Sequence, residues 1–175
     1  MSFNITPPRS EMDRRDEVLA KAYKNLIYFG RAFLPNDFLK KSESAPFHYE
    51  MGQKMIDTRP GARICNIIPR GHGKSVVAKA AIMHKLCFAA DDQQHFIAWV
   101  SEEQSQAIDH LKYIRSHFEN NKMIRYYFGN MDGGSVGKRW TEKDLVTPKG
   151  DRVISKGTSQ RLRGRAEVDV RYTGI

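Results

Sequence analysis

Residues 63–86 read RICNIIPRGHGKSVVAKAAIMHKL. An apolar run comes first, then a proline, two glycines, a lysine and a serine, and then apolar residues at helical spacing. A short run of β-branched and apolar residues is typical of a buried strand, whereas apolar residues three and four positions apart indicate a helix. The stretch therefore predicts a strand at 62–68, a strand-to-helix loop, and a helix from Ser75 to about Ala90.

The predicted loop has the residue types that hold a phosphate group. Backbone N–H groups must turn inward around the anion, and Gly71 and Gly73 permit that geometry. The N-terminus of the following helix directs its dipole at the anion. Lys74 would reach the β- and γ-phosphates, and the Ser75 hydroxyl would ligate Mg²⁺. The predicted ATP-binding residues of the loop are Pro69, Arg70, Gly71, His72, Gly73, Lys74 and Ser75.

The match to the phosphate-loop pattern is incomplete. The full pattern is G-x-x-x-x-G-K-[ST], and its first glycine would fall at Ile68. Gly-Lys-Ser also arises by chance, so the alternative is a charged turn that binds nothing. The position of the motif, after a predicted strand and before a predicted helix, favours the phosphate loop.

The rest of the chain continues the alternation of strands and helices. Residues 95–100, HFIAWV, predict a second buried strand, and SEEQ at 101–104 resembles a capping box that opens another helix. Near-continuous apolar strands alternating with helices predict a mainly parallel sheet flanked by helices. The remaining predicted elements are an amphipathic helix over 18–33, a short helix over 47–57, an irregular stretch over 120–137 and a hairpin turning at 148–150.

Composition limits the class of protein. The chain has 175 residues, of which 40% are hydrophobic and 28% charged, as in one ordinary soluble domain or part of a larger one. The formal charge of +9 favours an anionic partner such as a nucleic acid or nucleotide. The sequence has no apolar run of about 18 residues and no signal region, which predicts no membrane segment. Cys65 and Cys87 are expected to be buried and reduced, without the further ligands of a zinc site.

Four stretches, taken together and in their order along the chain, resemble the ATPase domain of phage terminase large subunits, the motors that package DNA into proheads. They are APFHYEMGQKMI, NIIPRGHGKS, HFIAWVSEEQSQAIDHLKYIRSHFE and RWTEKDLVTPKGDRVISKGTSQRLRG. The resemblance runs from about Phe47 to the C-terminus. It implies an α/β P-loop NTPase fold that uses ATP and Mg²⁺. Residues 1–46 would form an N-terminal helical segment and loop, and 47–175 a partial P-loop ATPase domain.

The resemblance also implies roles for individual residues. Terminases use a phosphate loop without the first glycine and with an arginine near its start, so Arg70 would lie beside the γ-phosphate and act in catalysis with Lys74. The alternative for Arg70 is a salt bridge at the edge of the loop. His48 falls where many such motors place a glutamine that contacts adenine, although it is also consistent with an ordinary helix residue.

A basic stretch near the C-terminus carries a further expectation. Arg161, Arg163 and Arg165 alternate, so they would project to one side of an extended segment. By the resemblance, Arg161 and Arg163 would face a neighbouring subunit's nucleotide or DNA. The alternative is a solvated basic loop.

One departure from the family concerns the acidic pair that holds magnesium and activates water. The resemblance places this pair soon after the Leu-Arg-Gly region, and the printed sequence stops at Ile175 before it, since Asp169 comes too early. We therefore expect the chain alone to hydrolyse ATP poorly. The complete protein would also carry a nuclease domain.

The function that the sequence predicts is the ATP-binding and ATP-hydrolysing portion of a packaging motor in the host cytoplasm. The expected partners are double-stranded DNA, further copies of the chain on a portal protein, and a small terminase subunit. Two alternatives stay open. One is another P-loop enzyme, such as a helicase or a small-molecule kinase, and the other is a non-catalytic basic module that binds nucleic acid.

Overall fold

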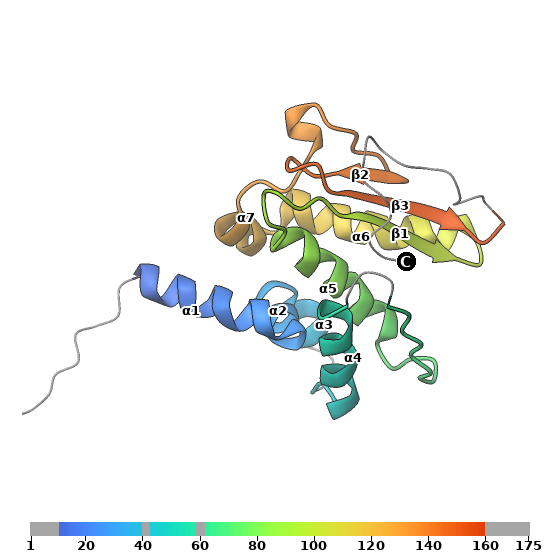
Figure 1. Cartoon of the computed structure of the whole chain (residues 1–175), viewed down its shortest axis with the longest axis horizontal. Coiled ribbons are helices and arrows are strands. Elements are labelled where there is room, and N and C mark those ends of the chain that lie inside the picture. The colour runs from blue at the N-terminus through green and yellow to red at the C-terminus, as the bar shows by residue number, and fades with distance from the viewer. Residues whose placement is uncertain (1–10, 40–42, 59–61, 160–175) are drawn as a thin grey trace, which may run out of the picture.

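A computed structural model describes residues 11–39, 43–58 and 62–159 of the chain. Helices α2, α3 and α4 form a group on one side of α5, and α6 and the sheet lie on its other side (Figure 1). The helices of the described ranges are α1 (Glu11–Lys24), α2 (Leu26–Phe33), α3 (Pro35–Phe38), α4 (Pro46–Ile56), α5 (Lys74–Cys87), α6 (Gln104–Asn120), α7 (Lys122–Phe128) and the 3-10 turn η1 (Gly134–Val136).

The sheet of the described residues has three strands in the order β1-β3-β2. Strand β1 (Phe96–Ser101) pairs in parallel with β3 (Arg152–Gly157), and β2 (Asp144–Val146) pairs antiparallel with β3. The predicted hairpin is confirmed, because Gly150 N–H donates to the Thr147 carbonyl at 3.0 Å in the turn between β2 and β3. The sheet is therefore mixed, not mainly parallel as the sequence predicts.

The strand predicted at 62–68 is wrong. These residues run without regular secondary structure, and β1 pairs with β3 instead of with this segment. Ile64 is 42% exposed and Ile67 is 93% exposed, so the apolar run is not a buried one. An apolar run becomes a strand only where another strand pairs with its backbone, and no strand of the described ranges does so.

Two helix boundaries that the sequence does not predict are set by asparagine side chains. The amphipathic stretch predicted as one helix is divided at Asn25, whose side chain accepts from the Tyr28 N–H at the start of α2. Asn121 accepts from the N–H groups of Met123 and Ile124 and begins α7 within the stretch predicted to be irregular. An asparagine side chain supplies the acceptor that the first turn of a helix lacks.

The capping box predicted at 101–104 is also wrong. Ser101 is the last residue of β1, and α6 begins at Gln104 after Glu103, whose side chain makes no capping bond. The serine side chain is used differently, because its hydroxyl accepts from the Trp99 indole N–H at 3.2 Å.

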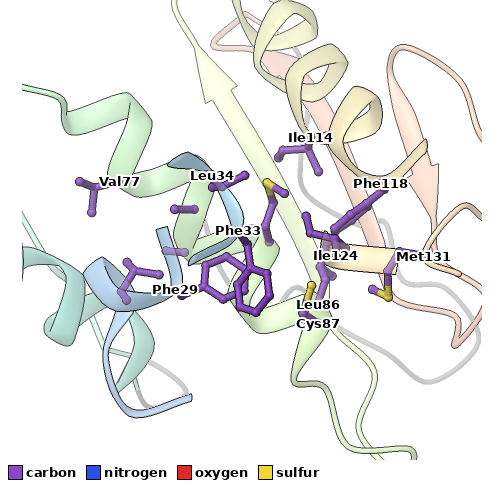
Figure 2. Close-up of a cluster of buried hydrophobic side chains, with 14 of the residues drawn as sticks. Phe29, Phe33, Leu34, Val77, Leu86, Cys87, Ile114, Phe118, Ile124 and Met131 are labelled. Atoms are coloured by element: carbon purple, nitrogen blue, oxygen red, sulfur yellow. The ribbon is translucent and has the colours of Figure 1, made fainter. Parts of the chain in front are cut away.

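The main core joins the helical group to the sheet. Phe29 and Phe33 of α2, Leu86 of α5 and Phe118 of α6 belong to one buried cluster, which Figure 2 shows. Residues Ile97, Leu145 and Val153, one from each strand, belong to the same cluster. Cys87 is buried in this core as predicted, whereas Cys65 is exposed, which corrects the expectation for that residue.

His84 is a buried polar residue within the helical part of this core. Its Nε2 lies 3.1 Å from the Ala22 carbonyl and 3.0 Å from the Tyr23 carbonyl, so a proton on Nε2 is donated to both. Burial lowers the pKa of His84, and the nearby Lys85 charge lowers it further, although the two carbonyls act in the opposite direction. The ring is therefore neutral in the folded protein at neutral pH.

We predict that the chain loses stability as the pH falls below about 6.5, the ordinary pKa of histidine. Below that pH the unfolded chain binds a proton at His84 that the folded chain does not, so the free energy of unfolding decreases. Urea unfolding at pH 7.5 and 5.5 measures the effect. The pKa values of His95, His110 and His117 are also lowered by burial and add to the same slope.

The control for this prediction is His84→Gln, which keeps a donor but does not titrate. The variant is expected to be less stable at pH 7.5 and to lose less stability between the two pH values. An unchanged pH slope in His84→Gln would contradict the account of the buried neutral ring.

Candidate functional site

The segment before α5 is a tight loop with two left-handed glycines. Gly71 has φ 82° and Gly73 has φ 71°, a region that residues with a Cβ rarely adopt. Helix α5 begins immediately afterwards at Lys74. The predicted helix therefore follows the loop at once and has 14 residues, but the strand predicted before the loop is not formed, so the expected strand-to-helix connection is only half confirmed.

The N-terminus of α5 lacks a side-chain cap. Its N-cap residue is Gly73, whose carbonyl accepts from the N–H groups of Val76 and Val77 at 3.0 Å. The N–H groups of the first residues of a helix have no acceptor within that helix, and the helix dipole adds partial positive charge there. The start of α5 thus offers backbone donors to an anion.

Lys74 is held against the loop in this structure. Its ammonium donates to the Ile68 carbonyl, and to the Pro69 carbonyl at 2.8 Å. Both acceptors precede Arg70 and the glycines, so the Lys74 side chain reaches back across the loop to the residues where it begins. A lysine whose partners are neutral carbonyls can exchange them for a phosphate, because hydrogen bonds between two charged groups are stronger.

His48 connects α4 to the loop. The Ala45 N–H donates to Nδ1 of His48 at 3.0 Å, which leaves the ring proton on Nε2. Nε2 then donates to the His72 carbonyl at 3.0 Å. The His72 ring turns back in the same manner, with Nδ1 donating to the Arg70 carbonyl at 2.9 Å. Two histidines thereby fix the backbone of the loop.

Gly73 is close to His48 as well as left-handed. A Cβ added at Gly73 would lie 3.3 Å from Nε2 of His48, which is tighter than an ordinary contact. Any other residue at this position would therefore strain the backbone and press on the histidine that holds the loop. Both effects explain why glycine stands before Lys74.

The loop opens into a hollow of about 650 Å³, within the usual range of about 300–1,000 Å³ for small-molecule sites. Arg70 and Ser75 are exposed and line it. Arg70 forms no ion pair with any other residue of the described ranges, so the salt bridge considered as its alternative role is not seen there. The other lining residues are Asp37, Phe38, Glu43, Ser44, Ala45, Phe47, His48, Gly71, His72, Gly73, Lys74, Val76 and Val77.

The lining of the hollow also includes Asp37, which the sequence did not single out. Asp37 of α3 accepts a hydrogen bond from the Tyr113 hydroxyl of α6, 76 positions later in the chain. The Lys79 ammonium lies 3.7 Å from the centre of the Tyr113 ring. Burial and the bond to Asp37 raise the pKa of Tyr113, so its hydroxyl keeps its proton and remains a donor. Only a helix boundary at Pro35 marks this region in the sequence.

His48 contacts the loop that carries the predicted ATP-binding residues 69–75. The predicted basic stretch cannot be compared in the same way. Arg161, Arg163 and Arg165 lie outside the described residues. Among the residues that are described, no three His, Cys, Asp or Glu side chains gather as a metal site. The Ser75 hydroxyl lines the hollow beside the loop, and the carboxylates of Asp37 and Glu43 line it as well; the role of Ser75 as a magnesium ligand stays a prediction.

No protein-family model matches the chain, and neither a curated protein nor a solved structure matches it. Within the described ranges, no helix has the length and apolar content needed to cross a membrane.

Proposed function

We propose that residues 69–75 bind the phosphates of ATP and that the chain is the ATP-binding and ATP-hydrolysing portion of a terminase-like motor that packages DNA. One observation carries the proposal. A loop with positive φ at Gly71 and Gly73 enters an uncapped helix N-terminus at Lys74 and opens into a hollow of about 650 Å³. Each of these features is what an extended polyanion requires.

Lys74 and Arg70 have complementary roles in this proposal. When a triphosphate enters, the Lys74 ammonium exchanges the carbonyls of Ile68 and Pro69 for phosphate oxygens. Arg70, at the exposed rim of the hollow, places a planar and permanently charged group beside the terminal phosphate. The two charges stabilise the phosphoryl group as it is transferred.

His48 supports this site through the loop backbone. Both of its ring nitrogens are engaged, one by the Ala45 N–H and the other by the His72 carbonyl. A role in contacting adenine would therefore use the face of the ring and not its nitrogens. The ring centre of Phe47 lies 4.1 Å from that of His48, so the two rings together form an aromatic surface beside the loop.

The charge of the chain supports a polyanionic partner in addition to the nucleotide. The formal charge is +9, and basic residues contact DNA through its phosphates without reading its sequence. A packaging motor requires this kind of contact, because it moves along DNA of any sequence. Double-stranded DNA, further copies of the chain, a portal protein and a small terminase subunit are thus the proposed partners.

The proposal is tested by titrating the chain with a fluorescent ATP analogue in the presence of Mg²⁺. Saturable binding that unlabelled ATP and tripolyphosphate both displace is the expected result. DNA binding without any displaceable nucleotide binding would instead support the basic nucleic-acid module.

Ser75→Ala is predicted to weaken binding of ATP several-fold when Mg²⁺ is present and to leave binding unchanged in excess EDTA. The reason is that the hydroxyl ligates the magnesium ion, which supplies charge neutralisation to the phosphates when it is bound. Ser116→Ala, an exposed serine of α6, is the matched control. Equal losses with Mg²⁺ and with EDTA would contradict the assignment of Ser75 as a magnesium ligand.

A further inference from the structure

The lining of the hollow carries groups of both charges. Arg70, Lys74 and the N-terminus of α5 form its loop end, and all of these attract anions. The carboxylates of Asp37 and Glu43, from a different segment of the chain, also line the hollow. A carboxylate repels a phosphate, so these side chains suit the part of a ligand that has neutral N–H or O–H donors.

Asp37 is the better placed of the two carboxylates because the protein holds it. Its Oδ2 accepts from the Tyr113 hydroxyl, while the other oxygen, Oδ1, receives no hydrogen bond from any residue within the described ranges. Tyr113 is itself fixed, since Lys79 lies over its ring at 3.7 Å and the His117 ring lies 4.6 Å away. A half-buried carboxylate held at one oxygen presents the other in a defined direction.

Apolar side chains line the same hollow as Asp37. Phe38, the next residue, lines the same hollow and is 5% exposed. Its ring rests against Gly30, where an added Cβ would approach within 2.7 Å of three ring carbons. Phe47, Val76 and Val77 also line the hollow. A lining of apolar side chains with a small number of placed polar groups is typical of a small-molecule site and is compatible with a nucleoside.

We propose that Asp37 recognises the nucleoside part of the bound nucleotide by accepting an N–H or O–H donor of its base or sugar on Oδ1, and that Tyr113 positions Asp37 for this contact. The inference rests on the proposed function, because it assumes that the phosphates occupy the loop end. Asp37 contacts the ligand in this arrangement, whereas Tyr113 acts only through Asp37.

The test compares ATP with tripolyphosphate, which has the phosphates but no nucleoside. Asp37→Asn keeps the shape of the side chain and removes its charge, so ATP binding is expected to weaken roughly tenfold, the order expected for a hydrogen bond to a charged group. Tripolyphosphate binding is expected to stay within about twofold or to strengthen, because a repulsive charge is gone. Asp109→Asn, an exposed aspartate of α6, is the matched control for charge.

Tyr113→Phe tests the positioning role, because it removes the hydroxyl and keeps the ring that Lys79 covers. It is expected to weaken ATP binding less than Asp37→Asn and to leave tripolyphosphate unaffected. The double variant should bind ATP no more weakly than Asp37→Asn alone, because both changes remove the same contact. Additive losses would show that Tyr113 acts independently of Asp37 and would overturn its assignment.

Three nucleotide analogues identify the donor. If the sugar supplies it, 2′-dATP or 3′-dATP binds the wild-type chain more weakly than ATP, and Asp37→Asn removes the difference. If the amino group of the base supplies it, inosine triphosphate behaves in this way instead. If none of the three analogues differs from ATP in the wild-type chain, the inference is overturned.

The binding experiments distinguish a failure of this inference from a failure of the proposed function. If Lys74→Ala lowers tripolyphosphate binding but Asp37→Asn leaves ATP affinity unchanged, the phosphate loop stands and Asp37 has no role in recognition. If Asp37→Asn lowers ATP and tripolyphosphate affinity equally and only with Mg²⁺, Asp37 lies on the metal, which overturns the nucleoside assignment. If the wild-type chain binds neither ligand, both proposals fail.

Discussion

Lys74→Ala is expected to weaken ATP binding by roughly 10- to 150-fold, the equivalent of about 1.5–3 kcal/mol for a hydrogen bond between charged groups. The ammonium already lies across the loop, bonded to the carbonyls of Ile68 and Pro69, so it needs only a local change to reach a phosphate. Tripolyphosphate should lose affinity by a similar factor, because the lost contact is to phosphate. Fluorescence titration of both ligands measures the effect.

The fold should survive this substitution. Lys74 is half-buried and lies outside the hydrophobic core, so the free energy of unfolding is expected to change by less than about 0.5 kcal/mol. Lys112→Ala, an exposed lysine of α6 paired with Glu142, controls for the loss of one positive charge. Equal ATP affinity in Lys74→Ala and in the wild-type chain would mean that the sequence GHGKS forms only a turn.

Phe33→Ala is expected to have the largest effect on stability, lowering the free energy of unfolding by about 3–5 kcal/mol. Phe33 is fully buried and lies among the labelled core residues of Figure 2. Its ring centre is 5.0 Å from that of Phe29, 5.3 Å from that of Tyr127 and 5.2 Å from that of Phe128. Removing the ring leaves a cavity where α2 and α7 meet, and urea unfolding measures the cost.

Ile67→Ala is the informative comparison for Phe33→Ala. Ile67 is 93% exposed, so its truncation should change the free energy of unfolding by less than about 0.5 kcal/mol. A loss of 2 kcal/mol or more, the usual range of about 2–5 kcal/mol for a buried isoleucine, would mean that residues 62–68 pack as the buried strand that the sequence predicts. The pair of variants thus tests the point at which sequence and structure differ.

The elements that the sequence predicts correctly are those whose signal is local. Helix α4 and helix α5 follow from apolar spacing, strand β1 from a short apolar run, and the β2–β3 hairpin from its turn residues. The tight loop at 69–73 follows from its glycines, since the structure gives Gly71 and Gly73 positive φ, whereas its binding of phosphate stays a prediction. Each of these is determined by neighbours within about four positions.

The features that the sequence does not predict depend on residues far apart in the chain, or on segments too short to show a periodic pattern. Residues 62–68 have the composition of a strand, but pairing is a property of two segments and β1 pairs with β3. Helix α7 has only seven residues, too few for a periodic signal, and it begins at the Asn121 cap. The same limit applies to the site, because the bond between Asp37 and Tyr113 joins residues 76 positions apart.

The most direct test of the central claim is to follow the backbone amide signals of the loop by NMR while Mg²⁺ and ATP are added to the wild-type chain. The claim is that the N–H groups of residues 71–75 hold the phosphates. The largest shifts are therefore expected at Gly71, Gly73, Lys74 and Ser75, with smaller shifts near Asp37, and tripolyphosphate should reproduce only the first set. Binding of ATP with its largest shifts elsewhere, and none at the loop, would contradict the account.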